Sequence, residues 1–220
     1  MWIVTPGKEK ERRGYFMERK GIDISHYQGD IDWSKVSNDG ISFAFIKATE
    51  GSEDGSAIVD KYLDKNVNGT NDNGIDAGAY HFAKFVSVND AVAEAKWFVK
   101  NIKGLPLTLP PVLDLEENNT KSDAEMNKAA RAFMEHVEKE IGSCILYSFG
   151  NFYRDHVDKS LLKDFTYWHA RYASTPINER LEDLFAWQYS KKGSVAGISG
   201  PVDLNKSGGK FFLNSKGSTI

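Results

Sequence analysis

Short β-rich runs that end in polar residues recur along this chain, with helix-compatible segments between them. The first runs lie at residues 21–25, 41–49, 75–82 and 109–116. Apolar residues then repeat at helical spacing over 89–102, and a second helical pattern over 122–142 opens with a capping box and ends at Gly142. Alternating strands and helices predict parallel strands joined by crossover helices.

The alternation weakens toward the C-terminus. Four further strands are expected at 144–148, 165–172, 184–190 and 201–204, with one clear helix among them near 151–157. We therefore expect the α/β class and an irregular, TIM-like β/α barrel rather than an open doubly wound sheet. Both glycine-rich phosphate fingerprints are absent from the sequence, which removes the usual reason to propose a nucleotide fold.

Length and charge narrow the choice of function. A chain of 220 residues suits one barrel domain or two small ones, and a net charge of −3 gives no general attraction for nucleic acid or an anionic membrane. No apolar stretch reaches the roughly 20 residues of a membrane span, and the charged start has no apolar core of a secretory signal. The single Cys144 excludes an intrachain disulfide and is expected to be a buried thiol.

Two carboxyl groups close one apolar strand. Asp114 and Glu116 are two residues apart, so in a strand they face the same way, roughly 6 to 7 Å apart along the backbone. Buried together they cannot both ionise easily, so one pKa should rise, as a general acid requires. A solvated strand-to-loop edge is the alternative, because Glu117 and the residues after it continue polar.

Asp23 and Asp203 repeat this placement near the ends of the first and last expected strands. In a barrel the carboxyl ends of the strands form one face, where active sites are assembled. Either acid alone is more often a helix cap or turn former. Their joint placement with Asp114 and Glu116 favours a catalytic cluster.

Aromatic and polar side chains lie near the same strand ends, and a cleft of aromatic platforms with polar donors suits a saccharide. These residues are Tyr80, His81, Phe82, Tyr147, Trp168, Arg171, Tyr172, Trp187 and Gln188. For Trp168 and Trp187, core packing and cleft lining remain equally open. A metal site at His81 and the acids has no supporting H-x-H or H-E-x-x-H spacing, so we predict no metal.

The order of short motifs resembles glycoside hydrolase family 25, the Chalaropsis-type lysozymes found as phage endolysins and bacterial autolysins. The matching pieces are Gly-Ile-Asp-Ile-Ser-His-Tyr-Gln (21–28), Ile-Asp-Trp (31–33), Phe-Ile-Lys-Ala-Thr-Glu-Gly (45–51), Gly-Ala-Tyr-His-Phe (78–82), Pro-Val-Leu-Asp-Leu-Glu (111–116), Trp-Gln-Tyr-Ser (187–190), Gly-Ile-Ser-Gly (197–200) and Val-Asp-Leu-Asn (202–205). Each is weak alone, but the ordered set is highly specific.

The resemblance implies five strand–helix units followed by three strands, with 21–205 as the catalytic domain. Residues 1–20 would be an N-terminal extension, and 206–220 a C-terminal tail or linker start. The implied activity is hydrolysis of the β-1,4 bond from N-acetylmuramic acid to N-acetylglucosamine, without metal or organic cofactor. By position Glu116 resembles the general acid, Asp114 would orient the 2-acetamido group, and Asp23 and Asp203 would support both. The residues that would contact the substrate are Tyr80, His81, Phe82, Tyr147, Trp168, Arg171, Trp187 and Gln188, together with Lys47 and Glu50.

Several alternatives remain. The second step could use the acetamido oxygen or a water activated by a carboxylate. Rival functions are a catalytically inactive glycan-binding barrel, a metal-dependent hydrolase using His81, and a chitinase-like N-acetylglucosaminidase. We expect peptidoglycan as the partner, with no nucleic acid, membrane or protein partner, and cytoplasmic synthesis without a signal peptide followed by action on the cell wall after release.

Overall fold

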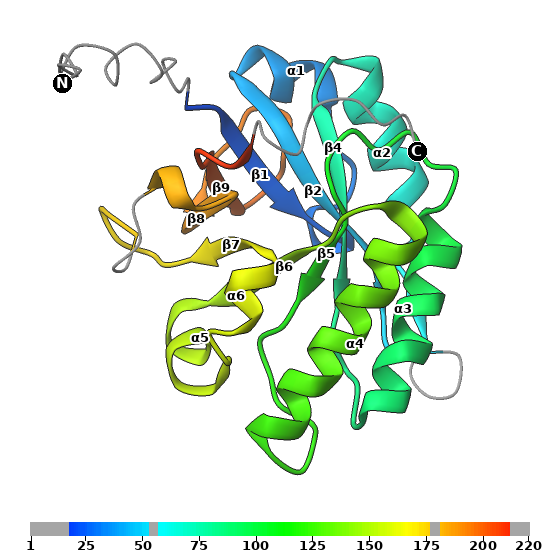
Figure 1. Cartoon of the computed structure of the whole chain (residues 1–220). Coiled ribbons are helices and arrows are strands. Elements are labelled where there is room, and N and C mark those ends of the chain that lie inside the picture. Colours follow the sequence, from blue (N-terminus) through cyan, green and yellow to red (C-terminus); the bar gives the residue numbers. More distant parts are fainter. Residues whose placement is uncertain (1–17, 53–56, 177–180, 212–220) are drawn as a thin grey trace, which may run out of the picture.

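The structure is a computed structural model that describes residues 18–52, 57–176 and 181–211 (Figure 1). Its strands are β1 (Lys20–Ile24), β2 (Ile41–Glu50), β3 (Ile58–Val59), β4 (Asp76–Phe82), β5 (Val112–Asp114), β6 (Ile145–Phe149), β7 (Thr166–Ala170), β8 (Ala186–Gly193) and β9 (Val202–Ser207). The pairing order is β1-β9-β8-β7-β6-β5-β4-β2, and β1 also pairs with β2. This closes a barrel, with β3 added antiparallel to the end of β2.

The barrel is irregular at one place in the ring. The barrel strands β1, β2 and β4 to β8 pair in parallel where they are neighbours, whereas β9 pairs antiparallel with both β8 and β1. Because β9 runs in reverse, its first residues lie at the same end of the barrel as the carboxyl ends of the other strands. The expected irregular β/α barrel is confirmed.

Helices follow the first five barrel strands. They are α1 (Trp33–Asn38), α2 (Leu63–Asp72), α3 (Val88–Ile102), α4 (Asp123–Ile141), α5 (Gly150–His156) and α6 (Leu161–Asp164). The predicted start and end of α4 are both found. The Ser122 side chain accepts from the Glu125 backbone N–H, and Gly142 ends the helix with a left-handed backbone conformation. After α6, which the sequence did not predict, β7, β8 and β9 follow with only a short 3-10 turn, η3 (Leu181–Asp183).

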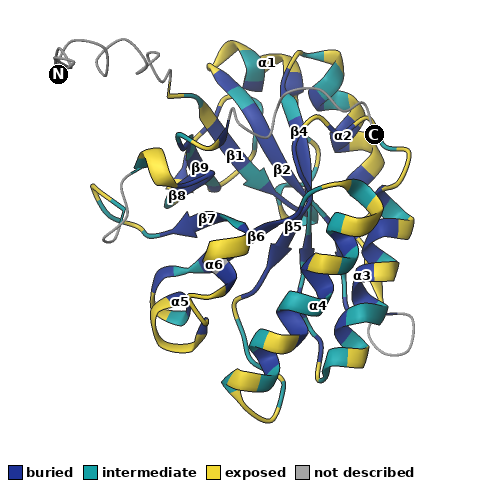
Figure 2. Ribbon diagram, in the orientation of Figure 1, coloured by how far each residue is buried: buried dark blue, intermediate teal, exposed yellow. Residues whose placement is uncertain are grey.

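Buried residues lie along the barrel strands and on parts of the helices (Figure 2), and their side chains form two layers. One layer fills the barrel interior and includes Phe43, Phe45, Trp168 and Phe185. The other packs between strands and helices, where Ala44 and Ile46 of β2 lie. Successive strand residues alternate between the two layers, so the position of a residue within its strand decides whether it faces the barrel interior or the helices.

The folded chain reaches beyond the limits expected from the sequence. Arg19 pairs with Asp76 at 2.7 Å, and its backbone carbonyl accepts from the Ser207 N–H at 2.9 Å. Phe211 is fully buried against Phe43 and Phe185, with ring centroids 4.8 Å apart in each case. Residues 1–17 and 212–220 lie outside the described ranges. Within those ranges, no helix is long and apolar enough to cross a membrane.

Candidate active site

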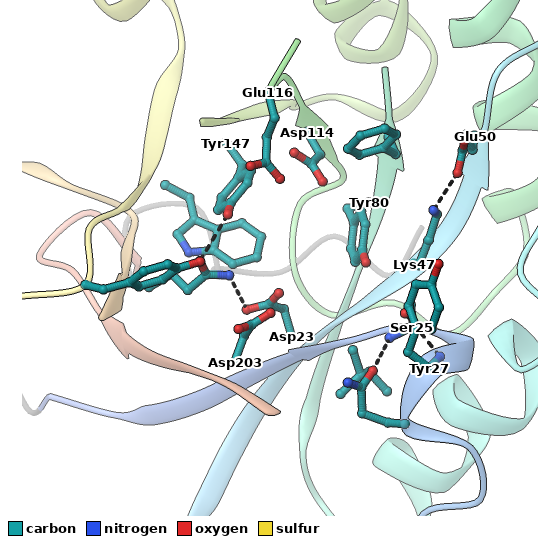
Figure 3. Close-up of a pocket in the computed structure, with 16 residues that line it drawn as sticks. Asp23, Ser25, Tyr27, Lys47, Glu50, Tyr80, Asp114, Glu116, Tyr147 and Asp203 are labelled. Carbon is teal, nitrogen blue, oxygen red and sulfur yellow. Dashed lines mark hydrogen bonds and ion pairs between the residues drawn. The ribbon is translucent and has the colours of Figure 1, made fainter. Parts of the chain in front are cut away.

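A pocket of about 440 Å³ opens at the carboxyl ends of the parallel strands (Figure 3). The lining residues are Asp23, Ile24, Ser25, Tyr27, Gln28, Lys47, Glu50, Tyr80, Phe82, Asp114, Glu116, Tyr147, Trp168, Tyr172, Gln188 and Asp203. All four acids singled out in the sequence therefore share one cavity. Lys47 and Glu50 both reach it although they are three residues apart, because a register shift interrupts β2 between Lys47 and Thr49.

Asp114 and Glu116 form the first carboxyl pair. Asp114 ends β5 and Glu116 follows two residues later, and their side chains share a hydrogen bond. Burial raises the pKa of Asp114 well above its usual range, and the neighbouring charge of Glu116 raises it further. Burial also raises the pKa of Glu116, and Asp203 adds to that rise. The pair is therefore arranged to hold one proton near neutral pH.

One oxygen of this pair has no partner. Asp114 is 7% exposed, and its Oδ1 atom makes no hydrogen bond within the described part of the chain. A buried acceptor without a donor is costly, and such atoms are rare in native structures. Asp114 also lines the pocket, so its carboxyl group lies next to the space that a ligand would occupy.

Asp23 and Asp203 form the second pair, from directly opposed positions of β1 and β9. Their side chains share a hydrogen bond. Burial raises the pKa of Asp23 from 3.8 to about 8, and the adjacent charge of Asp203 contributes to the rise. The pKa of Asp203 is also raised by burial. At neutral pH this pair, too, holds one proton, carried by Asp23.

Two amide side chains fix Asp23. Gln188 Nε2 and Asn205 Nδ2 both donate to Asp23 Oδ2, at 2.9 and 2.7 Å. The Gln188 amide is not free to flip, because the hydroxyl groups of Tyr147 and Tyr172 donate to its Oε1 atom.

Asn205 is held in the same way. Trp168 Nε1 donates to its Oδ1 at 2.8 Å. The Oδ2 atom of Asp23 therefore accepts twice, and we place the proton of Asp23 on its other oxygen.

Three expected substrate contacts lie outside the pocket. His81 is fully buried on the helix side of β4, with Nδ1 2.8 Å from Thr49 Oγ1 and Nε2 2.8 Å from Glu94 Oε2. Trp187 packs in the outer layer and donates to the Arg171 carbonyl at 2.9 Å. The guanidinium of Arg171 donates to the Thr175 carbonyl at 3.0 Å.

Strand alternation explains these corrections. Tyr80 and Phe82 face the pocket, so the residue between them points outward. The same rule puts Gln188 inside and Trp187 outside. Trp168 faces the barrel interior. It belongs to the buried core, since it is 2% exposed, and it also lines the pocket.

Several residues that line the pocket are not among the site residues predicted from the sequence. Tyr172 stood among the aromatic residues near strand ends but was not included with the substrate contacts. Ser25, Tyr27 and Gln28 lie within the motif at 21–28, yet their side chains carried no separate signal. Asn205 does not line the pocket, but its side-chain amide donates to Asp23. Its position in Val-Asp-Leu-Asn, two residues after Asp203, was the available indication.

A β/α barrel with paired carboxyl groups at the mouth and aromatic rings along the pocket is the construction of a glycoside hydrolase. Within the described residues, no cluster of three or more His, Cys, Asp or Glu side chains has the arrangement of a metal site. The sequence profile of Glycosyl hydrolases family 25 matches residues 22–198, and the chain belongs to this family.

Known proteins agree with this assignment. The chain is 36% identical over 192 residues to the uncharacterized protein YegX of Escherichia coli strain K12, covering 84% of this chain and 68% of that protein. It is 33% identical over 188 residues to an autolytic lysozyme of Clostridium acetobutylicum, covering 85% of this chain and 55% of the lysozyme. The crystal structure of a lysozyme from Streptomyces coelicolor superimposes with a TM-score of 0.78 at 31% identity, covering 90% and 95% of the two chains.

Proposed function

We propose that this protein is an N-acetylmuramidase, which hydrolyses the β-1,4 bond from N-acetylmuramic acid to N-acetylglucosamine in bacterial peptidoglycan. Family membership supports a glycoside hydrolase, and the lysozymes among its relatives support this bond. The observation that carries the proposal is the hydrogen-bonded pair of Asp114 and Glu116, which lines the same pocket as Asp23 and Asp203.

The pair supplies a proton when substrate arrives. An acetamido N–H that donates to the Asp114 carboxyl group stabilises the charged form of Asp114, so the shared proton moves to Glu116. Glu116 then donates that proton to the glycosidic oxygen as the bond to the anomeric carbon breaks, and the electron pair stays on the departing oxygen. In one route the acetamido oxygen bonds to the anomeric carbon and water then displaces it, whereas in the other route water attacks the anomeric carbon directly. In both routes the proton that this water loses returns to the carboxyl pair.

The second pair acts through charge. Asp203 is the anionic member of the Asp23 and Asp203 pair, so it favours the positive charge that develops on the sugar ring. Its charge also raises the pKa of Glu116, which favours transfer of the shared proton to that residue. Asp23 holds Asp203 in place, and the two amides of Gln188 and Asn205 hold Asp23.

The proposed place of action is the bacterial cell wall, as the name of the autolytic relative indicates for that protein. We propose synthesis in the cytoplasm followed by release, with peptidoglycan as the partner. The mechanism uses only carboxyl groups of this chain, so it needs no metal, organic cofactor or protein partner.

The test is an analysis of products. Purified peptidoglycan is digested, reduced with borohydride and analysed by mass spectrometry. New reducing ends of muramic acid support the proposal, whereas new ends of glucosamine identify an N-acetylglucosaminidase. No new ends from the folded wild-type protein identify an inactive glycan-binding barrel.

The role of Glu116 is tested in the same assay. Glu116→Gln should lower the release rate by about 10²- to 10⁴-fold, the usual contribution of a positioned acid. Glu135→Gln is the matched control, because Glu135 lies on the exposed side of α4 with its side chain 60% exposed. A Glu116→Gln protein with the wild-type rate would exclude Glu116 as the acid.

A further inference from the structure

The backbone between the two carboxyl groups of the first pair extends beyond the end of a strand. β5 ends at Asp114, which is paired with Tyr147 of β6, and Glu116 follows two residues later. Asp114 is therefore fixed by the sheet, and its backbone carbonyl also accepts from the Ala83 N–H at 2.9 Å. Glu116 lies outside the strand, yet its carboxyl group is turned toward that of Asp114 (Figure 3). The position of Glu116 thus depends on how the intervening residue, Leu115, is held.

A buried hydroxyl group holds this residue. The Leu115 N–H donates to the Tyr147 carbonyl at 3.0 Å, and the Leu115 carbonyl accepts from Ser148 Oγ at 2.7 Å. Neighbouring residues of β6 thus bind both polar backbone groups of Leu115, one through its backbone and the other through its side chain. Leu115 and Ser148 are both fully buried, so water does not compete for the hydrogen bond between them.

Ser148 lies on the opposite side of the sheet from the pocket. Tyr147 lines the pocket, and strand alternation directs the next side chain toward the helices. The layer between strands and helices is apolar, so an apolar side chain would suit this position. A buried hydroxyl group there is costly unless it is hydrogen-bonded, and its hydrogen bond goes to the backbone between the two carboxyl groups.

The backbone of Ser148 is held in turn by β7. Tyr167 Oη donates to the Ser148 carbonyl at 3.2 Å, and His169 Nδ1 lies 3.0 Å from the same hydroxyl oxygen. Because Tyr167 gives its one hydroxyl hydrogen to Ser148, His169 Nδ1 carries the hydrogen of the second bond. Tyr153 of α5 stacks on Tyr167, with ring centroids 4.6 Å apart. Buried side chains of α5 and β7 therefore fix Ser148 before any substrate binds.

We infer that Ser148 is a positioning residue, which acts through the Leu115 carbonyl to hold Glu116 against Asp114. The inference rests on the proposed function and adds how the proton donor is kept in place. Ser148 is not among the residues that line the pocket, so it touches neither the substrate nor the reacting bond. Its loss should therefore impair the step in which Glu116 delivers its proton and leave binding of the glycan strand intact.

The first test separates proton delivery from the rest of the reaction. Ser148→Ala should lower kcat on peptidoglycan strands by about 10- to 100-fold, the cost of a small misplacement of a reacting group, and leave KM unchanged. The initial release of dinitrophenolate from an aryl β-glycoside of N-acetylmuramic acid should keep the wild-type rate, because this leaving group needs no proton. An equal loss on both substrates, or an unchanged kcat on peptidoglycan, would overturn the inference.

Two further variants separate positioning from packing. Ser148→Thr keeps the hydroxyl group and should restore most of the rate on peptidoglycan. Ser207→Ala is the matched control, because Ser207 is equally buried and its hydroxyl group accepts from the Arg19 N–H at 2.8 Å, at the other end of the barrel. It makes the same chemical change and should leave kcat unchanged. A fall in kcat as large as that of Ser148→Ala would assign the effect to packing and overturn the inference.

The second test does not depend on turnover. The side-chain carboxyl carbon of Glu116 is followed by ¹³C NMR as a function of pH, and Glu116→Gln assigns its signal. Burial raises the pKa of Glu116, and the hydrogen bond with Asp114 lowers it. The charges of Asp203 and Glu117 raise it as well. Because Ser148→Ala should weaken the hydrogen bond between the two carboxyl groups, the Glu116 titration should move to higher pH.

An unchanged Glu116 titration in Ser148→Ala would overturn the inference. Failure of the proposed function has a different sign, since a folded wild-type protein that releases no muramic acid ends would refute the proposed function. The titration needs no substrate, so it would still decide whether Ser148 positions Glu116.

Discussion

Replacing Asp23 by Asn should stabilise the fold. In the wild type, Asp23 Oδ2 accepts from Gln188 and Asn205, and the other oxygen faces Asp203 with a proton. An asparagine fits the same network, because its carbonyl accepts from both amides and its NH₂ donates to Asp203. The substitution keeps every hydrogen bond and removes one titrating carboxyl group.

The magnitude follows from the pKa of Asp23, raised from 3.8 to about 8 mainly by burial. The folded protein keeps this proton until about pH 8, whereas the unfolded chain loses it near pH 4. Wild-type stability therefore falls between about pH 4 and pH 8, at up to about 1.4 kcal/mol per pH unit. At pH 7 this amounts to at most about 4 kcal/mol, and water in the pocket reduces it to about 2–4 kcal/mol.

Asparagine avoids this loss, so the free energy of unfolding at pH 7 should rise by about 2–4 kcal/mol and Tm by about 4–16 °C. Urea titration and calorimetry at pH 4, 7 and 9 measure the gain, which should be small at pH 4 and largest at pH 9. Asp72→Asn, at an exposed position of α2, is the control and should show no such pH dependence. A lower stability for Asp23→Asn at pH 7, or a gain independent of pH, would refute the reasoning.

Three further outcomes are expected. Phe211→Ala empties the space between Phe43 and Phe185 and should lower the free energy of unfolding in urea by about 3–5 kcal/mol. An unchanged free energy of unfolding would mean that Phe211 does not contribute to the packing of the barrel interior. Asp203→Asn removes a charge that helps burial to raise the pKa of Glu116, so the alkaline limb of the kcat/KM profile should move to lower pH, and a move to higher pH would contradict the charge argument. Dialysis against a chelator should leave peptidoglycan hydrolysis unchanged, and activity restored only by an added metal ion would support the metal-dependent alternative.

The barrel and its four acids could be predicted because they depend on local patterns. Acidic residues at the ends of strands come together when the sheet closes into a barrel. Asp23, Asp114, Glu116 and Asp203 do line one pocket. The aromatic set was less predictable. Nearness to a strand end does not fix the direction of a side chain, which depends on alternation along the strand, and His81 contacts Glu94 of α3 instead.

Interactions between distant segments could not be predicted from the sequence. Asn205 and Gln188 meet at Asp23 because β8, β9 and β1 are neighbours in the ring, an arrangement that no local pattern encodes. The stretch from Lys206 has the composition of a linker, yet β9 continues to Ser207 and Phe211 fills the barrel. A single large side chain in a polar segment carries too little periodicity to indicate its burial.

The most direct measurement compares two leaving groups in Glu116→Gln. Peptidoglycan strands leave as a sugar alkoxide that needs a proton, whereas an aryl β-glycoside of N-acetylmuramic acid with a dinitrophenolate leaving group does not. The account predicts a fall of about 10²- to 10⁴-fold on peptidoglycan and little change in the bond-breaking step of the aryl glycoside, measured as the initial release of dinitrophenolate. An equal fall in that step on both substrates would show that Glu116 does not deliver the proton.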